Sequence, residues 1–364
     1  MAEAATAATS PVTTEGGPGA PSRGRLARGV LLVVIALLVL QLVRAARVPR
    51  FSSFDGEAMA TTWQVTLPEG ADPAAAAAAA EACFALFRRL DVELSEWQEG
   101  SPLSAVNRAA GIAPVAVPEE LFALVARAVE IGRETDGAFD VSWAALWGVW
   151  DFRAALPAVP ESAAIAARRV LVDYRRVVLD PAGRTIFLPE SGMKIGLGGI
   201  AKGYALERAG ALLVERGFEN FLLVSGGQVY ARGSRGGRPW QVGVRDPRGA
   251  RDDIFATLPL AGGSLSTSAD NESFFVVAGV RYHHILDPKT GWPTQGLRSA
   301  TILAADPTLA DALSTAVMVL GRERGLEVAR RLGAGALVVD ERGEVAMTPE
   351  LAAILTLLHS PRRS

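Results

Sequence analysis

The chain has 364 residues, of which 49% are hydrophobic and 21% are charged, and its formal net charge is -2. Its charges are scattered and no basic stripe stands out, which argues against a nucleic-acid binder because neutralising phosphates needs clustered Lys and Arg. The single cysteine, Cys83, excludes a disulfide framework or a cysteine metal cluster within one chain. This length and composition are typical of a globular protein with one large core or two modest ones.

The N-terminal region differs in composition from the rest of the chain. Residues 1–22 are rich in Ala, Thr, Gly and Pro and lack apolar periodicity, so we expect a disordered tail. Three arginines then precede the uncharged run 29–43, which is longer than a usual signal h-region but short of the roughly 20 residues that comfortably span a bilayer. Residues 23–50 are therefore expected to form a signal anchor or a long signal peptide.

The anchor is favoured over a cleaved signal peptide for two reasons. Ala45 offers only a poor small-residue cleavage site, and no cysteine follows the run to accept a lipid. An N-terminal anchor ahead of a large domain usually exports that domain. We therefore expect a single anchor in the inner (cytoplasmic) membrane, with residues 51–364 as one extracytoplasmic or periplasmic domain.

The first predicted helix begins with Asp72 as its N-cap and Pro73 in its first turn. Its apolar residues fall on one helical face: Phe84, Phe87, Leu90 and Leu94. A second helix is predicted over 118–133, and a hairpin is predicted to turn at 181–183.

A third helix is predicted from Ile200 to Arg216, ending before Gly217. The segments that read as strands come next: 221–233, 240–246, 254–260, 274–286 and 299–305. A helix over 308–320 is expected to close at Gly321, with one more helix and a strand at 335–340 after it. Strands clustered at short spacing, with helices before and after them, favour a single α+β domain with a mixed or antiparallel sheet over a doubly wound one.

Two glycine clusters are candidates for ligand contact. The stretch Met193 to Tyr204 is a glycine-rich turn running into a helix, where backbone N–H groups can hold a phosphate and Lys202 adds positive charge. It matches neither the dinucleotide fingerprint nor a Walker loop, and a tight packing turn explains its glycines equally well. The second cluster, Val224 to Gly233, is explained as readily by a hairpin or a bulge.

Asp311, Ser314 and Thr315 stand at i, i+3 and i+4, so a helix places their three oxygens on one face. Oxygen ligands suit a hard cation such as Mg²⁺, which normally keeps water and substrate phosphate as further ligands. A structural alternative remains open, because an aspartate in a first turn complements the helix dipole and small hydroxyl residues pack well against a neighbour.

Two of the three histidines stand side by side at 283 and 284, at the end of a predicted strand. A neutral imidazole there, with Asp287 three or four residues on, is suited to act as a general base or a phosphate contact near pH 7. Adjacent strand residues face opposite ways, so we assign only one of the two to chemistry.

A succession of blocks resembles the FAD:protein FMN transferase (ApbE) family, in the family's order and over roughly residues 56–358. The blocks are Met59 to Val65, Leu94 to Asn107, Thr135 to Trp150, Gly196 to Ala209, Val224 to Gly233, Pro239 to Pro247, Tyr282 to Pro293 and Ala310 to Gly321. The resemblance implies an enzyme that binds FAD with Mg²⁺ and transfers the FMN moiety to a Thr or Ser hydroxyl of an acceptor protein, with release of AMP. The implied acceptor is an electron-transfer protein with an extracytoplasmic flavin domain.

The resemblance also implies roles for individual residues. The implied FAD contacts are Met59, Trp97, Ala138, Phe139, Asp140, Gly196, Lys202 and Ile285. The implied metal ligands are the backbone carbonyl of Gly199, Asp311 and Thr315, with Ser314 as a further candidate. His284 matches the histidine on which the family relies for activity, and we expect it to take the proton of the incoming hydroxyl with help from Asp287.

Two departures from the family pattern bear on FAD binding. Ala60 stands where many relatives have glycine, which makes close backbone approach less permissive. Gly196 stands where many relatives carry aspartate, so a side-chain hydrogen bond is lost and FAD affinity is expected to fall, unless water fills the gap. Two rival functions stay open: a Mg²⁺-dependent FAD pyrophosphatase that yields FMN and AMP, and a non-catalytic, membrane-anchored FAD-binding protein.

Overall fold

The computed structural model describes residues 30–37 and 50–362, apart from positions 71, 153, 155 and 251. The chain divides into two units, Met1–Val48 and Pro49–Ser364. In the first unit residues 30–37 are helical, whereas the expected tail at 1–22 and most of the expected anchor at 23–50 lie outside the described residues. Within the described ranges, no helix combines the length and apolarity that crossing a membrane requires.

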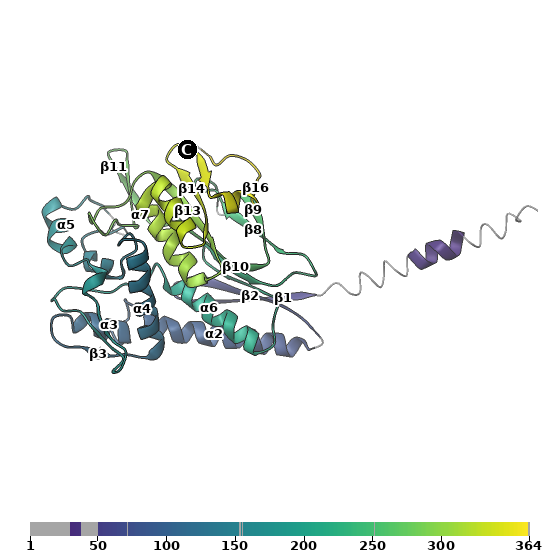
Figure 1. The fold of residues 1–364 in the computed structure, drawn as a ribbon, viewed down its shortest axis with the longest axis horizontal. Coiled ribbons are helices and arrows are strands. Elements are labelled where there is room, and N and C mark those ends of the chain that lie inside the picture. The colour runs from purple at the N-terminus through teal and green to yellow at the C-terminus, as the bar shows by residue number, and fades with distance from the viewer. Residues whose placement is uncertain are drawn as a thin grey trace, which may run out of the picture. The chain divides into compact units, whose positions relative to one another are not determined.

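The second unit is built on an eight-stranded sheet in which every neighbouring pair is antiparallel (Figure 1). Its strands, in spatial order, are β1 (Phe51–Ala58), β2 (Thr61–Pro68), β6 (Phe221–Ser225), β7 (Gln228–Arg232), β10 (Gly262–Ala269), β13 (Leu297–Ala304), β14 (Gly335–Asp340) and β15 (Val345–Met347). The predicted α+β class with an antiparallel sheet is confirmed.

Three long helices, α2 (Pro73–Leu94), α6 (Ala201–Glu215) and α7 (Pro307–Arg331), cover one face of this sheet. The α2 N-cap is Asp72, whose carboxylate accepts from Ala74 N at 2.9 Å, and the four predicted face residues of α2 are all buried. The backbone of Gly321 is not helical, with φ of 74°, so α7 breaks where the sequence predicted a helix end. These helices place α6 against α7, and this contact builds the site described below.

A small sheet packs on the opposite face of the large sheet. It consists of β8 (Trp240–Arg245), β9 (Ile254–Leu260) and β16 (Thr356–Leu357), and the short helix α8 (Pro349–Ala352) lies near it. Alternation along β10 assigns its two faces: Leu265 packs into the core beneath the small sheet, and Ser268 points toward α7.

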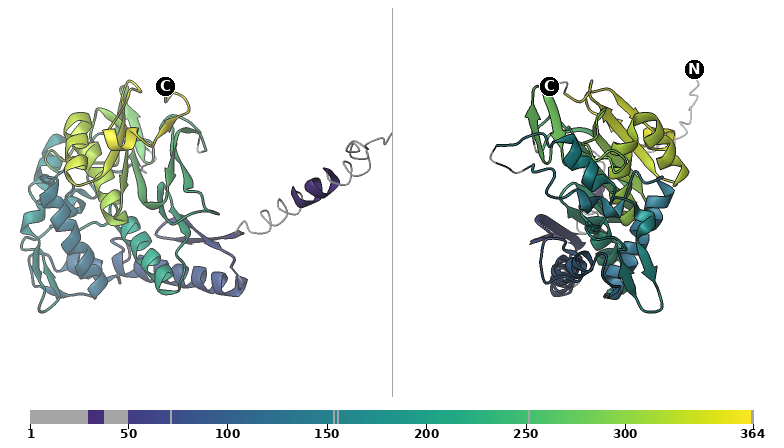
Figure 2. Two further views of the ribbon diagram at one scale, coloured as in Figure 1. Left: turned by 45° about the vertical axis from the view of Figure 1, so that its right-hand side comes forward. Right: turned by 90° about the vertical axis from the view of Figure 1, so that its left-hand side faces the viewer.

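The remaining elements form a lobe beside α7 (Figure 2). They are α3 (Pro102–Arg108), β3 (Val115–Ala116), α4 (Glu119–Glu134), the 3₁₀ helix η1 (Val141–Leu146), α5 (Ser162–Arg169), the 3₁₀ helix η2 (Tyr174–Arg176), β4 (Val178–Asp180), β5 (Thr185–Phe187), β11 (Phe274–Val277) and β12 (Val280–His283). The hairpin β11–β12 ends directly before His284, so the lobe presents the candidate histidine to the rest of the domain.

The turn between β1 and β2 contains two non-glycine residues in the left-handed region, Met59 with φ of 50° and Ala60 with φ of 56°. An L-residue there costs about 1–2 kcal/mol, whereas glycine adopts it freely but loses more entropy on folding. We expect Ala60→Gly to raise the free energy of unfolding by about 0.5–1 kcal/mol, measured by urea denaturation. The control Ala58→Gly, in β1, should lower it by about 0.5–1 kcal/mol. A loss of stability in Ala60→Gly would contradict the prediction.

Candidate active site

The glycine-rich turn is held by hydrogen bonds from neighbouring segments. The Asn107 amide binds both backbone groups of Ile195, with Ile195 N to Oδ1 at 2.7 Å and Nδ2 to Ile195 O at 2.9 Å. Gly196 N donates to Val141 O at 2.9 Å, and Trp143 Nε1 donates to Gly196 O at 3.1 Å. The turn is therefore fixed from two sides before it enters α6.

The first turn of α6 lies directly against the first turns of α7. Gly203 N donates to Asp311 Oδ2 at 2.9 Å. A Cβ on Gly203 would stand 2.3 Å from Pro307 O and 2.7 Å from Asp311 Cβ, so only glycine permits this approach. Asp311 is 5% exposed, and its carboxylate is thus held at the point where the glycine-rich turn becomes helix.

Hydroxyl groups gather beside Asp311. Ser268, on β10, contacts Ser314 with 2.7 Å between the hydroxyl oxygens and Thr315 with 3.3 Å between them. Ser314 Oγ also donates to Asp311 O at 2.8 Å. A Cβ on Gly199 would lie 3.3 Å from Thr315 Oγ1, which places the Gly199 backbone next to this cluster. All four residues implied as metal ligands therefore lie together, and Ser268 joins them.

The donor set of this cluster consists of oxygen atoms only. It offers one carboxylate, several hydroxyls and the backbone of the glycine-rich turn, which suits a hard cation such as Mg²⁺ that retains water and ligand phosphate. Among the described residues, no three His, Cys, Asp or Glu side chains are grouped so that they could hold a metal ion, as a zinc site would usually require. The residues present therefore fit Mg²⁺.

The two histidines face opposite ways, as the strand alternation predicts. His283 is 2% exposed, and its Nε2 lies 2.8 Å from Thr294 O, so it serves the packing of the loop. His284 is exposed, and Ser273 O accepts from its backbone N at 3.0 Å and lies 3.3 Å from its Nδ1. Because a carbonyl oxygen can only accept, Nδ1 carries the proton and Nε2 is left with a free lone pair.

Surrounding groups keep His284 neutral. Neighbouring protein atoms displace part of the water around the imidazole, and this desolvation lowers its pKa. The charges of His283 and Lys202 lower the pKa further. The Ser273 carbonyl and the Glu272 carboxylate act in the opposite direction. A neutral imidazole with a free Nε2 can accept a proton near pH 7.

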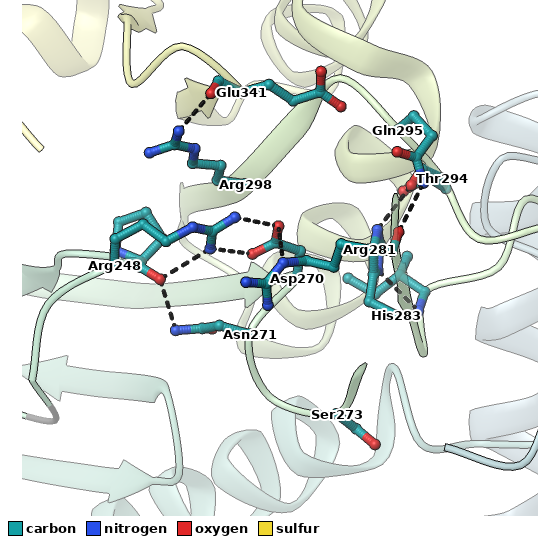
Figure 3. A network of polar contacts seen from close by, with 12 residues as sticks. Arg248, Asp270, Asn271, Ser273, Arg281, His283, Thr294, Gln295, Arg298 and Glu341 are labelled. Carbon is teal, nitrogen blue, oxygen red and sulfur yellow. Dashed lines mark hydrogen bonds and ion pairs between the residues drawn. The ribbon is translucent and has the colours of Figure 1, made fainter. Parts of the chain in front are cut away.

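A buried ion pair anchors the loop that carries Ser273 (Figure 3). Asp270 is 5% exposed, and Arg248 binds its two carboxylate oxygens at 2.6 Å each, with Arg281 Nε at 3.7 Å. Asn271 Nδ2 donates to Pro247 O at 2.9 Å. These contacts fix the segment that sets the orientation of His284.

Asp287 does not contact His284 in the described part of the chain. Its Oδ1 accepts from Lys289 N at 2.8 Å, and its backbone carbonyl accepts from Gly291 N at 2.7 Å. Asp287 therefore shapes the turn that follows the histidines.

The segment 138–140 approaches the glycine-rich turn through Phe139, whose Cε2 lies 3.4 Å from the position of a Cβ on Gly199. Ala138 and Phe139 are both buried. Asp140 caps η1: its Oδ1 accepts from Ser142 N at 2.8 Å and its Oδ2 from Tyr174 N at 2.9 Å. Both Asp140 oxygens are thus used locally, although the residue stands beside the site.

The other implied FAD contacts occupy different surroundings. Trp97 is 73% exposed and stacks on Trp147 with 4.0 Å between ring centroids, which gives the site an accessible aromatic face. Met59 lies at the β1–β2 turn, and Ile285 is 5% exposed beside His284. Lys202 Nζ lies 3.3 Å from Gly198 O, so it is held over the glycine-rich turn.

The space beside Gly196 is filled by protein rather than by water. A Cβ on Gly196 would stand 2.9 Å from both Trp143 Nε1 and Ala144 Cβ, so the indole occupies the place of a residue-196 side chain. A carboxylate nevertheless reaches this turn, because Glu96 Oε2 accepts from Leu197 N at 2.5 Å. Burial raises the pKa of Glu96 to about 7, while the backbone N–H groups and Lys202 oppose the rise.

Glu96 and Ser268 were both missed by the sequence analysis. Ser268 lies on β10, whose Gly- and Ser-rich sequence gave no strand signal. Glu96 stands next to Trp97 in a recognised block, but its partner Leu197 is 101 positions away. Only the fold reveals that contact.

Comparison with known proteins identifies the family of this chain. A family model described as the ApbE family matches residues 59–338. A protein of Treponema pallidum named FAD:protein FMN transferase is 35% identical over 278 residues, covering 72% of this chain and 77% of that protein. The crystal structure of the ApbE protein from Thermotoga maritima has a TM-score of 0.77 at 34% identity, covering 84% of this chain and 99% of that one. The apo flavinyl transferase ApbE of Pseudomonas stutzeri has a TM-score of 0.75 at 28% identity, with coverages of 84% and 97%. The chain is therefore a member of the ApbE family.

Proposed function

We propose that the protein is a Mg²⁺-dependent FAD:protein FMN transferase. It moves the FMN moiety of FAD to a Thr or Ser hydroxyl of an acceptor protein and releases AMP. The observation that carries the proposal is that the glycine-rich turn meets the oxygen cluster of α7. Gly203 N donates to Asp311 Oδ2 at 2.9 Å, and a Cβ on Gly199 would lie 3.3 Å from Thr315 Oγ1. Relatives named for this activity support it.

The chemistry requires little covalent work from the protein, because phosphoryl transfer is catalysed mainly by positioning and charge neutralisation. The bond between the flavin-side phosphorus and the bridging oxygen breaks, and AMP leaves with that oxygen. A new bond forms between the same phosphorus and the acceptor hydroxyl oxygen. The hydroxyl proton passes to Nε2 of His284, whose Nδ1 is held by Ser273 O.

The other residues hold the ligands. The residues that would hold Mg²⁺ are those of the oxygen cluster: Asp311, Thr315, Ser314 and, through its carbonyl, Gly199. When bound, the ion would neutralise charge on the diphosphate and on the departing AMP. Lys202 adds positive charge at the turn. Exposed Trp97 offers a ring face suited to stacking on a flavin.

One incubation separates the candidate activities. The protein is mixed with FAD, Mg²⁺ and an acceptor fragment, and the products are resolved by fluorescence of the denatured protein and by chromatography. Flavin bound covalently to the acceptor together with AMP supports the transferase. Intact FAD would identify a flavin-binding protein without catalysis and would overturn the proposal.

A FAD pyrophosphatase activity at the same site is the second candidate. The exposed position of His284 favours it, because water can reach the imidazole as readily as an acceptor hydroxyl can. Free FMN together with AMP, in amounts that do not fall when the acceptor fragment is added, would identify this activity as the main one.

The N-terminal sequence bears on where the protein is located and on which acceptor it meets. We propose that residues 23–50 anchor the domain in the inner membrane with the site outside the cytoplasm, on the strength of the uncharged run 29–43. The acceptor is then an extracytoplasmic electron-transfer protein. Mass spectrometry of co-expressed candidates should detect an added FMN, and cell fractionation should recover the full chain with membranes.

The pH dependence of transfer tests the role of His284. A base works in its neutral form, and a pKa lowered from the usual 6.5 keeps His284 neutral to lower pH. The rate at saturating FAD should therefore hold through neutral pH and decline with a midpoint below 6.5. His284→Ala should lower the rate by about 10²–10⁴-fold and lose this decline.

The pH dependence of the rate is also measured in a Glu96 variant, because Glu96 has a pKa of about 7 and its titration could be mistaken for that of His284. Glu96→Gln eliminates that second group and should retain the decline at acid pH. A midpoint above 6.5 in this variant would argue against His284 as the base.

A further inference from the structure

The glycine-rich turn receives a carboxylate from a distant part of the chain. Glu96 follows the end of α2, and its Oε2 accepts from Leu197 N at 2.5 Å. Its Oε1 lies 3.7 Å from the position of a Cβ on Gly198, so both carboxylate oxygens face the turn. Neither the implied FAD contacts nor the implied metal ligands include Glu96.

The segment that carries Glu96 is itself fixed. Ser95 Oγ accepts from the backbone N of Trp97 and of Gln98, at 3.2 Å each. Ser101, the N-cap of α3, donates to Ser95 O at 2.5 Å. Ser104 Oγ donates to Glu96 O at 3.4 Å. Hydrogen bonds within its own segment therefore fix the backbone of Glu96. Glu96 can hold the glycine-rich turn without depending on that turn for its own position.

Leu197, whose backbone N–H donates to Glu96, is also the residue whose carbonyl begins the turn into α6. Leu197 O accepts from Ile200 N at 3.0 Å and from Ala201 N at 2.9 Å, the first bonds of that helix. Fixing Leu197 therefore fixes the direction in which Gly199 and Lys202 follow. Trp143 Nε1 donates to Gly196 O, the carbonyl of the same peptide group as Leu197 N, so this peptide group is held at both ends.

We propose that Glu96 is a positioning residue for flavin transfer, which holds the glycine-rich turn so that the Gly199 carbonyl and Lys202 are presented to Mg²⁺ and the FAD diphosphate. The inference rests on the proposed function. Without the carboxylate, the Leu197 N–H loses its partner and the turn gains freedom that ligand binding must then remove. The cost should fall on ligand affinity, because His284 is held by a separate loop.

A competing interpretation predicts the opposite effect, which makes the test decisive. A carboxylate on backbone N–H groups at a helix start could compete with the diphosphate for the same donors. Removing such a competitor would tighten FAD binding. The positioning role predicts weaker binding, so the two interpretations differ in sign.

The test compares Glu96→Ala, Glu96→Gln and the control Glu99→Ala, an exposed carboxylate in the same loop. Leaving a buried donor such as the Leu197 N–H without its partner corresponds to about five- to a hundredfold in affinity. Glu96→Ala should raise the KM for FAD and the Mg²⁺ concentration for half-maximal rate by about tenfold or more, with kcat changed less than about threefold. Glu96→Gln should restore most of the affinity, because its amide oxygen still accepts from Leu197 N, and Glu99→Ala should match the wild type.

Two readouts keep this proposal separate from the proposed function. FAD binding in the presence of Mg²⁺ is measured by flavin fluorescence without acceptor, and thermal melting confirms that each variant is folded. A wild-type protein that binds FAD but labels no acceptor would defeat the transferase assignment and still allow the Glu96 test. An unchanged or lower dissociation constant for FAD in folded Glu96→Ala would overturn the positioning role.

Discussion

Asp311→Asn should reduce flavin transfer by at least about 1,000-fold while leaving the protein folded. The change keeps the size of the side chain, and the amide oxygen can still accept from Gly203 N, as the carboxylate does at 2.9 Å. It removes the only carboxylate of the oxygen cluster, and charge neutralisation by a metal ion is worth several kcal/mol in such reactions. The measurement is the initial rate of acceptor labelling with FAD over a range of Mg²⁺ concentrations.

Asp306→Asn is the matched control for this variant. Asp306 lies one residue before α7, and its Oδ1 accepts from Leu309 N at 3.0 Å, so it is the N-cap of the same helix. Asparagine caps helices about as well as aspartate, and the ion pair that is lost, with Arg127 at 3.1 Å, is partly exposed. Stability should therefore change by less than about 1 kcal/mol, and labelling should stay near the wild-type value. Chelation with EDTA should abolish wild-type labelling, and Mg²⁺ should restore it. Labelling by Asp311→Asn within about tenfold of the wild type would remove Asp311 from the metal site.

The sequence predicted the long helices α2, α4, α6 and α7 because their signals are local, whereas the shorter helices α3 and α5 were not predicted. The Asp72 cap, the apolar face of α2 and the break at Gly321 each depend on residues within a few turns of one another. The strand β10 was missed because Gly262–Ala269 is rich in glycine and serine, which have low strand propensity. This strand is stabilised by its pairing with β7 and β13, which are far away in the sequence.

The candidate site divides in the same way. The i, i+3, i+4 spacing was sufficient to place Asp311 and Thr315 on one face, and strand alternation was sufficient to separate His283 from His284. Contacts between distant segments could not be read from spacing. The indole of Trp143 against Gly196 is one example. The sequence suggested a gap where relatives carry a side chain at position 196, but the indole fills that space.

Closeness in sequence did not identify the hydrogen-bond partner of His284, as Asp287 shows. It stands three residues after His284, yet its carboxylate closes its own turn on Lys289 N. The group that sets the tautomer of His284 is instead the carbonyl of Ser273, across the hairpin β11–β12. A backbone carbonyl has no signature in the sequence, so only the pairing of the two strands could identify it.

Asp270→Asn should lower the free energy of unfolding by about 3 kcal/mol or more, because it leaves the charge of Arg248 buried without its partner. The two side chains are 8% and 16% exposed, and both Arg248 nitrogens lie 2.6 Å from carboxylate oxygens. Urea denaturation followed by tryptophan fluorescence measures the loss. Glu219→Gln, in the exposed pair with Arg232 at 2.8 Å, should cost less than about 1 kcal/mol.

The same variant should affect catalysis in a particular way. Asp270 anchors the loop that ends at Ser273, and Ser273 O holds both the backbone N and the Nδ1 of His284. Loosening this loop should lower kcat for transfer by about tenfold, since the imidazole is less often aimed at the acceptor hydroxyl. The KM for FAD should change little, because the glycine-rich turn is held by other contacts. Equal losses in kcat and in FAD affinity, in protein that melts as a single folded species, would show that the ion pair supports the whole site rather than the histidine.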